Sequence, residues 1–69
     1  MSPSELDLRG VPCPLNWVRT RLALEELSPG AELLVRLDPG EPRESVSRSA
    51  REDGHDVDAR DDVVRIVRP

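Results

Sequence analysis

Glycine and proline divide the apolar residues of this 69-residue chain into short blocks, and this division limits what the chain can fold into. The breaks fall at Gly10 and Pro12, at Pro29-Gly30, at Pro39-Gly40 and at Gly54. Helices and strands rarely continue through such residues, so each block has room for one short element. A chain of this length also supports only one hydrophobic core, and we expect a single domain over residues 1–69.

The pattern of apolar residues within the blocks predicts the order of the elements. Strands are expected over residues 5–9, 31–37, 55–60 and 63–67, with Asp61-Asp62 as a hairpin turn between the last two. Helices are expected over residues 14–27 and 42–53, and the second depends mainly on Val46 and Ala50. This βαβαββ order is typical of an α+β fold, a two-layer α/β sandwich with a mixed four-stranded sheet and two helices on one face.

Composition excludes several classes of protein. Intrinsic disorder is the alternative for a chain with 35% charged residues, but the periodic Leu and Val blocks argue against it. The net charge of −4 argues against binding nucleic acid through its phosphates. No apolar run is long enough for a membrane span or a leader segment, and one cysteine cannot form an internal disulfide. We therefore expect a cytoplasmic monomer without a direct nucleic-acid or membrane partner.

The first predicted helix carries two apolar stripes, although only one of them can face the sheet. At 100° per residue, one stripe contains Trp17, Thr20, Leu24 and Leu27, and the opposite one contains Leu15, Val18 and Leu22. We assign the longer Trp17 stripe to the core. The other, called the Leu15 patch below, is then exposed and available for docking a partner protein. The alternative is that the second helix covers it.

Cys13, the only cysteine, lies between Pro12 and Pro14 at the start of this helix. Proline suits the first helical position, so we expect Pro14 there and Cys13 as the N-cap, with its sulfur over the free N–H groups of the first turn. A helix N-terminus favours negative charge, and this setting predicts a reactive thiolate. The alternative is a small buried side chain, which is what most free cysteines are.

Other chemistry-bearing patterns are missing from the sequence. His55 has no neighbours at metal-ligand spacing, and no Ser-His-Asp set or phosphate loop is present. We therefore expect no metal and no cofactor.

The stretch from Leu6 to Pro14, Leu-Asp-Leu-Arg-Gly-Val-Pro-Cys-Pro, resembles the TusA/SirA-like sulfur-carrier family. The resemblance continues through the helix ending before Pro29-Gly30, the strand ending at Asp38-Pro39, and Gly54-His55, and so covers nearly the whole chain. It implies the same βαβαββ fold. It also implies that Cys13 is the catalytic residue of a sulfurtransferase-type relay, accepting sulfane sulfur as a persulfide from a donor such as a cysteine desulfurase.

The implied relay then passes the sulfur to an acceptor protein, in tRNA thiolation or in another sulfur-trafficking pathway. Pro14 matches the family's Cys-Pro pair, Arg9 its Arg-Gly, and Asp38 its acidic residue after the second strand. Arg9 is a candidate to hold the anionic sulfur, the alternative being a solvated charge. We expect Asp38 to cap the second helix, the alternative being that it orients the Cys13 loop.

The chain departs from the family pattern Cys-Pro-x-Pro at Asn16, which stands where the second proline is usual. Asparagine keeps the backbone N–H and adds a side-chain amide. One hypothesis is that Asn16 gives Cys13 an extra hydrogen-bond donor; the other is that it only replaces the proline in the first turn. The alternative function for the whole chain is a non-catalytic regulatory module that binds a protein through the Leu15 patch.

Overall fold

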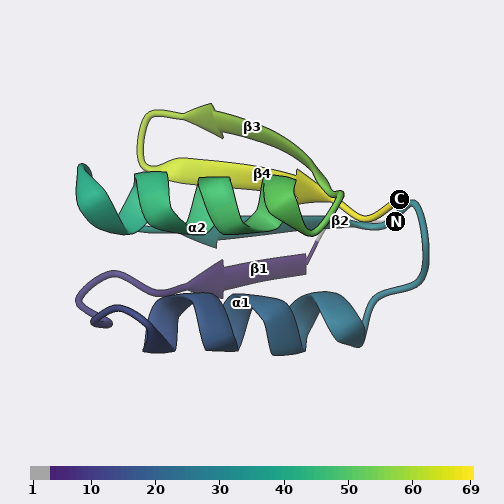
Figure 1. The fold of residues 1–69 in the computed structure, drawn as a ribbon, viewed down its shortest axis with the longest axis horizontal. Helices are drawn as coiled ribbons and strands as arrows, with labels where there is room; N and C mark the ends of the chain where they lie inside the picture. The colour runs from purple at the N-terminus through teal and green to yellow at the C-terminus, as the bar shows by residue number, and fades with distance from the viewer. Residues whose placement is uncertain (1–3) are drawn as a thin grey trace.

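The two central strands of the sheet alternate between buried and more exposed residues, as their sequences predict. The computed structural model describes residues 4–69 (Figure 1). Along the chain it contains β1 (Ser4–Asp7), α1 (Leu15–Glu25), β2 (Glu32–Arg36), α2 (Glu41–Glu52), β3 (Asp56–Arg60) and β4 (Val63–Val67). The predicted order of the six elements is confirmed, and so are the bounds of the last strand.

The first helix is shorter than the predicted 14–27 at both ends. At its C-terminal end, Glu26 and Leu27 donate their N–H groups to the carbonyls three residues earlier, those of Ala23 and Leu24. This tighter hydrogen-bond pattern commonly closes the last turn of an α-helix. The regular helix therefore ends at Glu25, and residues 26–27 belong to its closing turn.

The sheet is mixed, with the strand order β1-β2-β4-β3. Strand β1 pairs in parallel with β2, whereas β4 lies between β2 and β3 and runs antiparallel to both. It follows that β1, β2 and β3 point in the same direction. The two helices lie side by side across one face of this sheet and begin at the same end of the molecule (Figure 1). The predicted two-layer α+β architecture is confirmed.

The core lies between the helices and the covered face of the sheet. One row across the four strands is Leu6, Val35, Val64 and Ala59, and the next is Ser4, Leu33, Ile66 and Val57. The fully buried apolar residues are Leu8, Leu24, Leu33, Val35, Leu37, Val46, Ala50, Val64 and Ile66. Helix α2 contributes Val46 and Ala50, four residues apart on one side, which confirms that its slight apolar content is enough to anchor it.

The open face of the sheet is charged. Its central row across the four strands is Glu5, Leu34, Arg65 and Asp58. Arg65 pairs with Glu32 on the neighbouring strand, and Arg36 pairs with Asp62 at 3.4 Å. Charged groups of both signs on an uncovered sheet keep it hydrated and discourage further strands or sheets from stacking on it.

Candidate functional site

The segment that leads from β1 to α1 is fastened to the end of β2. The N–H of Leu8 donates to the carbonyl of Arg36 at 2.8 Å, and the Leu8 side chain is buried in the core. Two residues later, the N–H of Gly10 donates to Oδ2 of Asp38 at 2.7 Å. Gly10 has a φ of +80°, a conformation that costs glycine little. The loop that carries Cys13 is thus held by contacts to residues 28 positions away.

Asp38 therefore holds the Cys13 loop rather than capping the second helix. The N-cap of α2 is Gly40, and no side chain caps it. The expectation that Asp38 caps α2 is wrong, because its carboxylate accepts the Gly10 N–H instead. The alternative that it orients the loop is what the hydrogen bond supports.

Cys13 is an exposed free thiol two residues before α1. Both helices begin at the same end of the molecule (Figure 1). The Cys13 sulfur lies 3.9 Å from the hydroxyl oxygen of Ser45, in the second turn of α2. A small buried side chain, the alternative interpretation of Cys13, is therefore wrong.

The sequence motifs did not indicate Ser45 as a neighbour of Cys13, although the order of the elements places the start of the second helix near it. Strands β1, β2 and β3 run in one direction and the connecting helices return across one face, so the starts of α1 and α2 share an edge. Residues early in the second helix are therefore candidate neighbours of Cys13.

The start of α1 differs from the predicted arrangement. The helix begins at Leu15, and Pro14 is its N-cap, with φ −94° and ψ 5°, following a cis Cys13–Pro14 peptide bond. The N–H of Asn16 donates to the Pro12 carbonyl at 3.1 Å. The predictions that Pro14 is the first helical residue and that Cys13 is the N-cap are wrong, since Pro14 lacks helical ψ and a first-turn amide already has a backbone acceptor.

Asn16, which departs from the family pattern, is fully buried. Its Oδ1 accepts the N–H of Trp17 at 2.7 Å, and its backbone carbonyl accepts the Thr20 hydroxyl at 2.8 Å. Its Nδ2 is buried and has no hydrogen-bond partner within residues 4–69. The side-chain hydrogen bond of Asn16 thus lies inside α1 and does not include the Cys13 sulfur, and a donor role toward that sulfur stays a prediction.

Arg9 is committed to Asp7 rather than to the sulfur. Its Nε and Nη2 donate to the two carboxylate oxygens of Asp7 at 3.0 and 2.8 Å. Hydrogen bonding from Arg9 lowers the pKa of Asp7 to about 2, and the same bond raises the pKa of Arg9. The structure does not bring Arg9 and Cys13 together, and this exposed pair fixes the end of β1 at the start of the loop.

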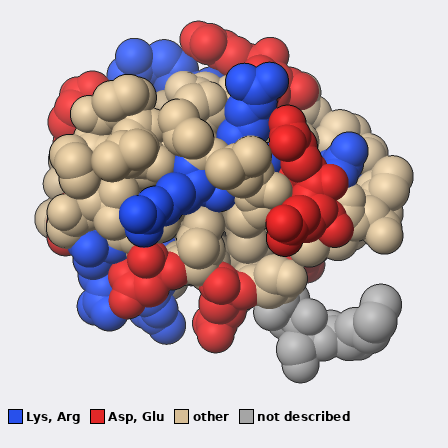
Figure 2. Space-filling view, turned by 90° about the horizontal axis from the view of Figure 1, so that it is seen from below, with Lys and Arg blue, Asp and Glu red and all other residues tan. Residues whose placement is uncertain are grey.

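The Leu15 patch is exposed beside Cys13. Leu15, Val18 and Leu22 are 49%, 45% and 57% exposed, whereas Thr20 and Leu24 on the other stripe are buried. The assignment of the Trp17 stripe to the core is confirmed, and the alternative that α2 covers the Leu15 patch is wrong. Seen from the α1 side, a broad area without charged residues lies over the end where α1 begins (Figure 2).

The sequence profile of the family described as "Sulfurtransferase TusA" matches residues 4–67. The chain belongs to the TusA sulfurtransferase family. The match extends from the first described strand to the last, so it includes the Cys13 loop, the Leu15 patch and Ser45.

Two relatives carry the name "Putative sulfur carrier protein". One, from Archaeoglobus fulgidus, is 40% identical over 52 residues, which are 75% of this chain and 59% of the relative. The other, from Thermotoga maritima, is 36% identical over 52 residues, again 75% of this chain and 66% of the relative. The similar stretch thus spans about three fifths to two thirds of the relatives' own length.

Among solved structures, the crystal structure of a SirA-like protein from Desulfitobacterium hafniense superposes with a TM-score of 0.72. The two share 24% sequence identity, and the match covers 90% of this chain and 89% of that one. This likeness confirms the fold. Over the part of the chain that the structure describes, no helix is long and apolar enough to cross a membrane, and no group of three or more His, Cys, Asp or Glu is placed to hold a metal ion.

Proposed function

We propose that this protein is a sulfur carrier that accepts sulfane sulfur as a persulfide on Cys13 and passes it to an acceptor protein. The observation that carries the proposal is the exposure of the Cys13 thiol in a chain of the TusA sulfurtransferase family. The sequence contains no second cysteine, so a persulfide on Cys13 cannot react to form an internal disulfide. That property suits a carrier and not a dithiol oxidoreductase.

The transfer needs two exchange steps of the same kind. In the first, the Cys13 thiolate attacks the outer sulfur of a donor persulfide, the donor's S–S bond breaks, and the donor cysteine leaves as a thiolate. The outer sulfur keeps its proton, and Cys13 now carries –S–SH. In the second, an acceptor thiolate attacks that outer sulfur and Cys13 leaves as the thiolate. No external oxidant or reductant is required, and access to the sulfur limits both steps.

The surroundings of Cys13 support a protein rather than a small molecule as the exchange partner. The sulfur lies at an open edge, with the exposed Leu15 patch beginning two residues later. Apolar side chains of this size contribute to docking when a partner removes them from water. We infer that donor and acceptor proteins dock on this patch in turn.

We place this relay in the cytoplasm, where thiols stay reduced. A thiolated tRNA nucleoside is one end product that the family resemblance implies, and other sulfur pathways would use the same two exchange steps.

A small persulfide donor tests the loading step without any docking partner. Wild-type protein and Cys13→Ser are incubated with the donor and analysed by intact mass spectrometry. We expect the wild type to gain the mass of one sulfur atom, which a reductant removes, and Cys13→Ser to gain nothing. The same gain in both proteins would overturn Cys13 as the acceptor, and no gain in either would overturn the carrier function.

A further inference from the structure

A second surface feature lies on the other side of α2 from the Cys13 contact. It is a groove of about 550 Å³ between α2 and β3. Its lining residues are Arg43, Glu44, Ser47, Arg48, Arg51, Glu52 and Ala59. Ser45, which contacts Cys13, and Ser47 in the groove are two residues apart, a turn of about 200° around a helix. The groove is therefore separate from the sulfur site.

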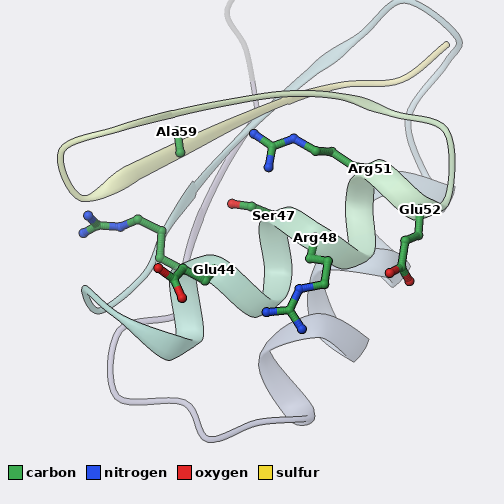
Figure 3. A pocket seen from close by; sticks show the side chains of 7 residues that line it. Glu44, Ser47, Arg48, Arg51, Glu52 and Ala59 are labelled. Carbon is green, nitrogen blue, oxygen red and sulfur yellow. The ribbon is translucent and has the colours of Figure 1, made fainter.

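The side chains of α2 form two stripes at the groove. Arg43, Ser47 and Arg51 are spaced four residues apart and so lie on one side of the helix. Figure 3 shows Ser47 and Arg51 pointing toward the strand that carries Ala59, whereas Arg48 and Glu52 point to the other side of α2. The inner stripe thus presents two guanidinium groups and one hydroxyl, and faces a small side chain that leaves space between helix and strand.

Two polar atoms of the inner stripe are buried without a hydrogen-bond partner inside residues 4–69. They are the hydroxyl oxygen of Ser47, a residue only 4% exposed, and Nε of Arg43. A helical serine usually satisfies its hydroxyl at a carbonyl of the preceding turn, which Ser47 does not. Arg43 is anchored through Nη2 to the carbonyl of Leu37 at 3.4 Å, which leaves Nε free for another acceptor. A buried polar atom without a partner is costly, and a ligand that widens the groove enough to reach these two atoms would remove that cost.

The charges of the groove select the kind of ligand. Five arginines pair with carboxylates within residues 4–69, among them Arg36 with Asp62 and Arg65 with Glu32, whereas Arg19, Arg48 and Arg68 form no ion pair. Across the same residues, neither Arg43 nor Arg51 forms an ion pair either. Guanidinium groups only donate hydrogen bonds, whereas a serine hydroxyl can donate or accept. Three arginines against Glu44 and Glu52 give the lining a net positive charge, which favours an anionic acceptor as the ligand. The arginine fork matches the oxygens of a phosphate group.

We propose that the groove between α2 and β3 binds a phosphate group through Arg43, Ser47 and Arg51. The shared chemistry is a dianionic tetrahedral phosphate, supplied either as the inorganic ion or as a small phosphate monoester. This site is independent of the sulfur relay proposed above, and neither depends on the other.

Titration with inorganic phosphate, followed by amide NMR spectra at constant ionic strength, tests the proposal. We expect saturable shifts at Ser47, Arg51 and Ala59, and none when chloride replaces phosphate. Arg51→Gln should weaken binding about tenfold and Ser47→Ala about fivefold, because each removes a donor to a charged ligand. Arg19→Gln is the matched control, because it makes the same charge change at an exposed arginine of α1 outside the groove lining, and it should alter affinity less than about twofold.

The spectra also report whether each variant is folded, and Ser47→Ala only removes a hydroxyl without a partner. Absence of saturable shifts in the wild type, or equal losses in Arg19→Gln and Arg51→Gln, would overturn the site. Ribose 5-phosphate separates the two sources: tighter binding than inorganic phosphate supports a monoester, and equal binding supports the free ion. A single-stranded RNA that binds more tightly than both ligands, and whose binding depends as much on Arg19 as on Arg51, would overturn the small-ligand site in favour of nucleic acid. Cys13→Ser should bind phosphate like the wild type.

Discussion

The outer surface of α1 and the open face of the sheet are both left uncovered by the core, yet they are built from opposite kinds of residue. Beside Cys13, α1 exposes the three apolar side chains of the Leu15 patch. The open sheet face instead carries charged rows, with pairs such as Arg65–Glu32 and Arg36–Asp62. Exposed apolar groups favour protein docking, whereas a charged face stays hydrated. We therefore expect partners to dock on the outer surface of α1, next to Cys13, and not on the open face of the sheet.

The largest expected effect is the difference in stability between a substitution on the covered face of the sheet and one on the open face. Leu33 and Leu34 are neighbours on β2, with Leu33 2% exposed in the core and Leu34 on the open face. Leu33→Ala should destabilise the domain by about 3 kcal/mol, because it leaves a cavity in the core. Leu34→Ala should cost about 1 kcal/mol or less. Urea unfolding of the two variants measures this difference, and equal losses would contradict the assignment of the faces.

The next prediction compares the two uncovered surfaces directly. Val18→Gln should slow sulfur transfer from a cysteine desulfurase about fivefold. The reason is that the half-exposed Val18 side chain contributes to docking when the donor protein removes it from water, and glutamine does not. Leu34→Gln makes a comparable polar change on the open sheet face and should leave the rate unchanged. Loading of both variants by a small persulfide donor should match the wild type. Equal slowing by the protein donor in both variants would contradict docking at the Leu15 patch.

A smaller effect concerns the loop between these two surfaces. Asp38→Ala removes the acceptor of the Gly10 N–H and should lower the free energy of unfolding by about 1 kcal/mol. Asp38→Asn keeps a side-chain oxygen and should lose less. Thermal or urea unfolding of the pair checks this order. If the asparagine variant lost as much as the alanine variant, the carboxylate charge rather than the hydrogen bond would be what holds the loop.

The smallest effect is the pH dependence of the exposed ion pairs. Arg9 lowers the pKa of Asp7 to about 2 from 3.8, and Arg65 lowers that of Glu32. A depressed carboxyl pKa stabilises the folded state above the unfolded pKa, and this stabilisation is lost as the pH falls from about 4 to about 2. Asp7→Asn should therefore be slightly less stable than the wild type at pH 7, and this difference should shrink on acidification. A difference that grew at low pH would contradict the pairing.

The fold was predictable because each helix and strand is indicated by residues within its own short segment of the sequence. Periodicity and the Gly/Pro breaks place all six elements, and Val46 and Ala50 are enough to orient α2. The exposure of the Leu15 patch also followed from helical spacing, because one helix cannot bury two opposite stripes against a single sheet.

The site was only partly predictable because its contacts are not local. The hydrogen bond from Gly10 to Asp38 spans 28 residues, and the contact from Cys13 to Ser45 spans 32. The error at the start of α1 has a different cause, because the contact that decides it spans only four residues. Whether Pro14 is the cap or the first helical residue depends on which acceptor the Asn16 amide meets, and the loop brings the Pro12 carbonyl to it.

If a donor protein docks on the Leu15 patch and passes its sulfur to Cys13, a complete donor system should load this protein. Wild-type protein is incubated with a cysteine desulfurase and cysteine, and its intact mass is followed over time beside that of Cys13→Ser. We expect one added sulfur on the wild type, which a reductant removes, and none on Cys13→Ser. A wild type that stays unmodified while a small persulfide donor loads it would contradict docking, and sulfur gained by Cys13→Ser would contradict the role of the thiol itself.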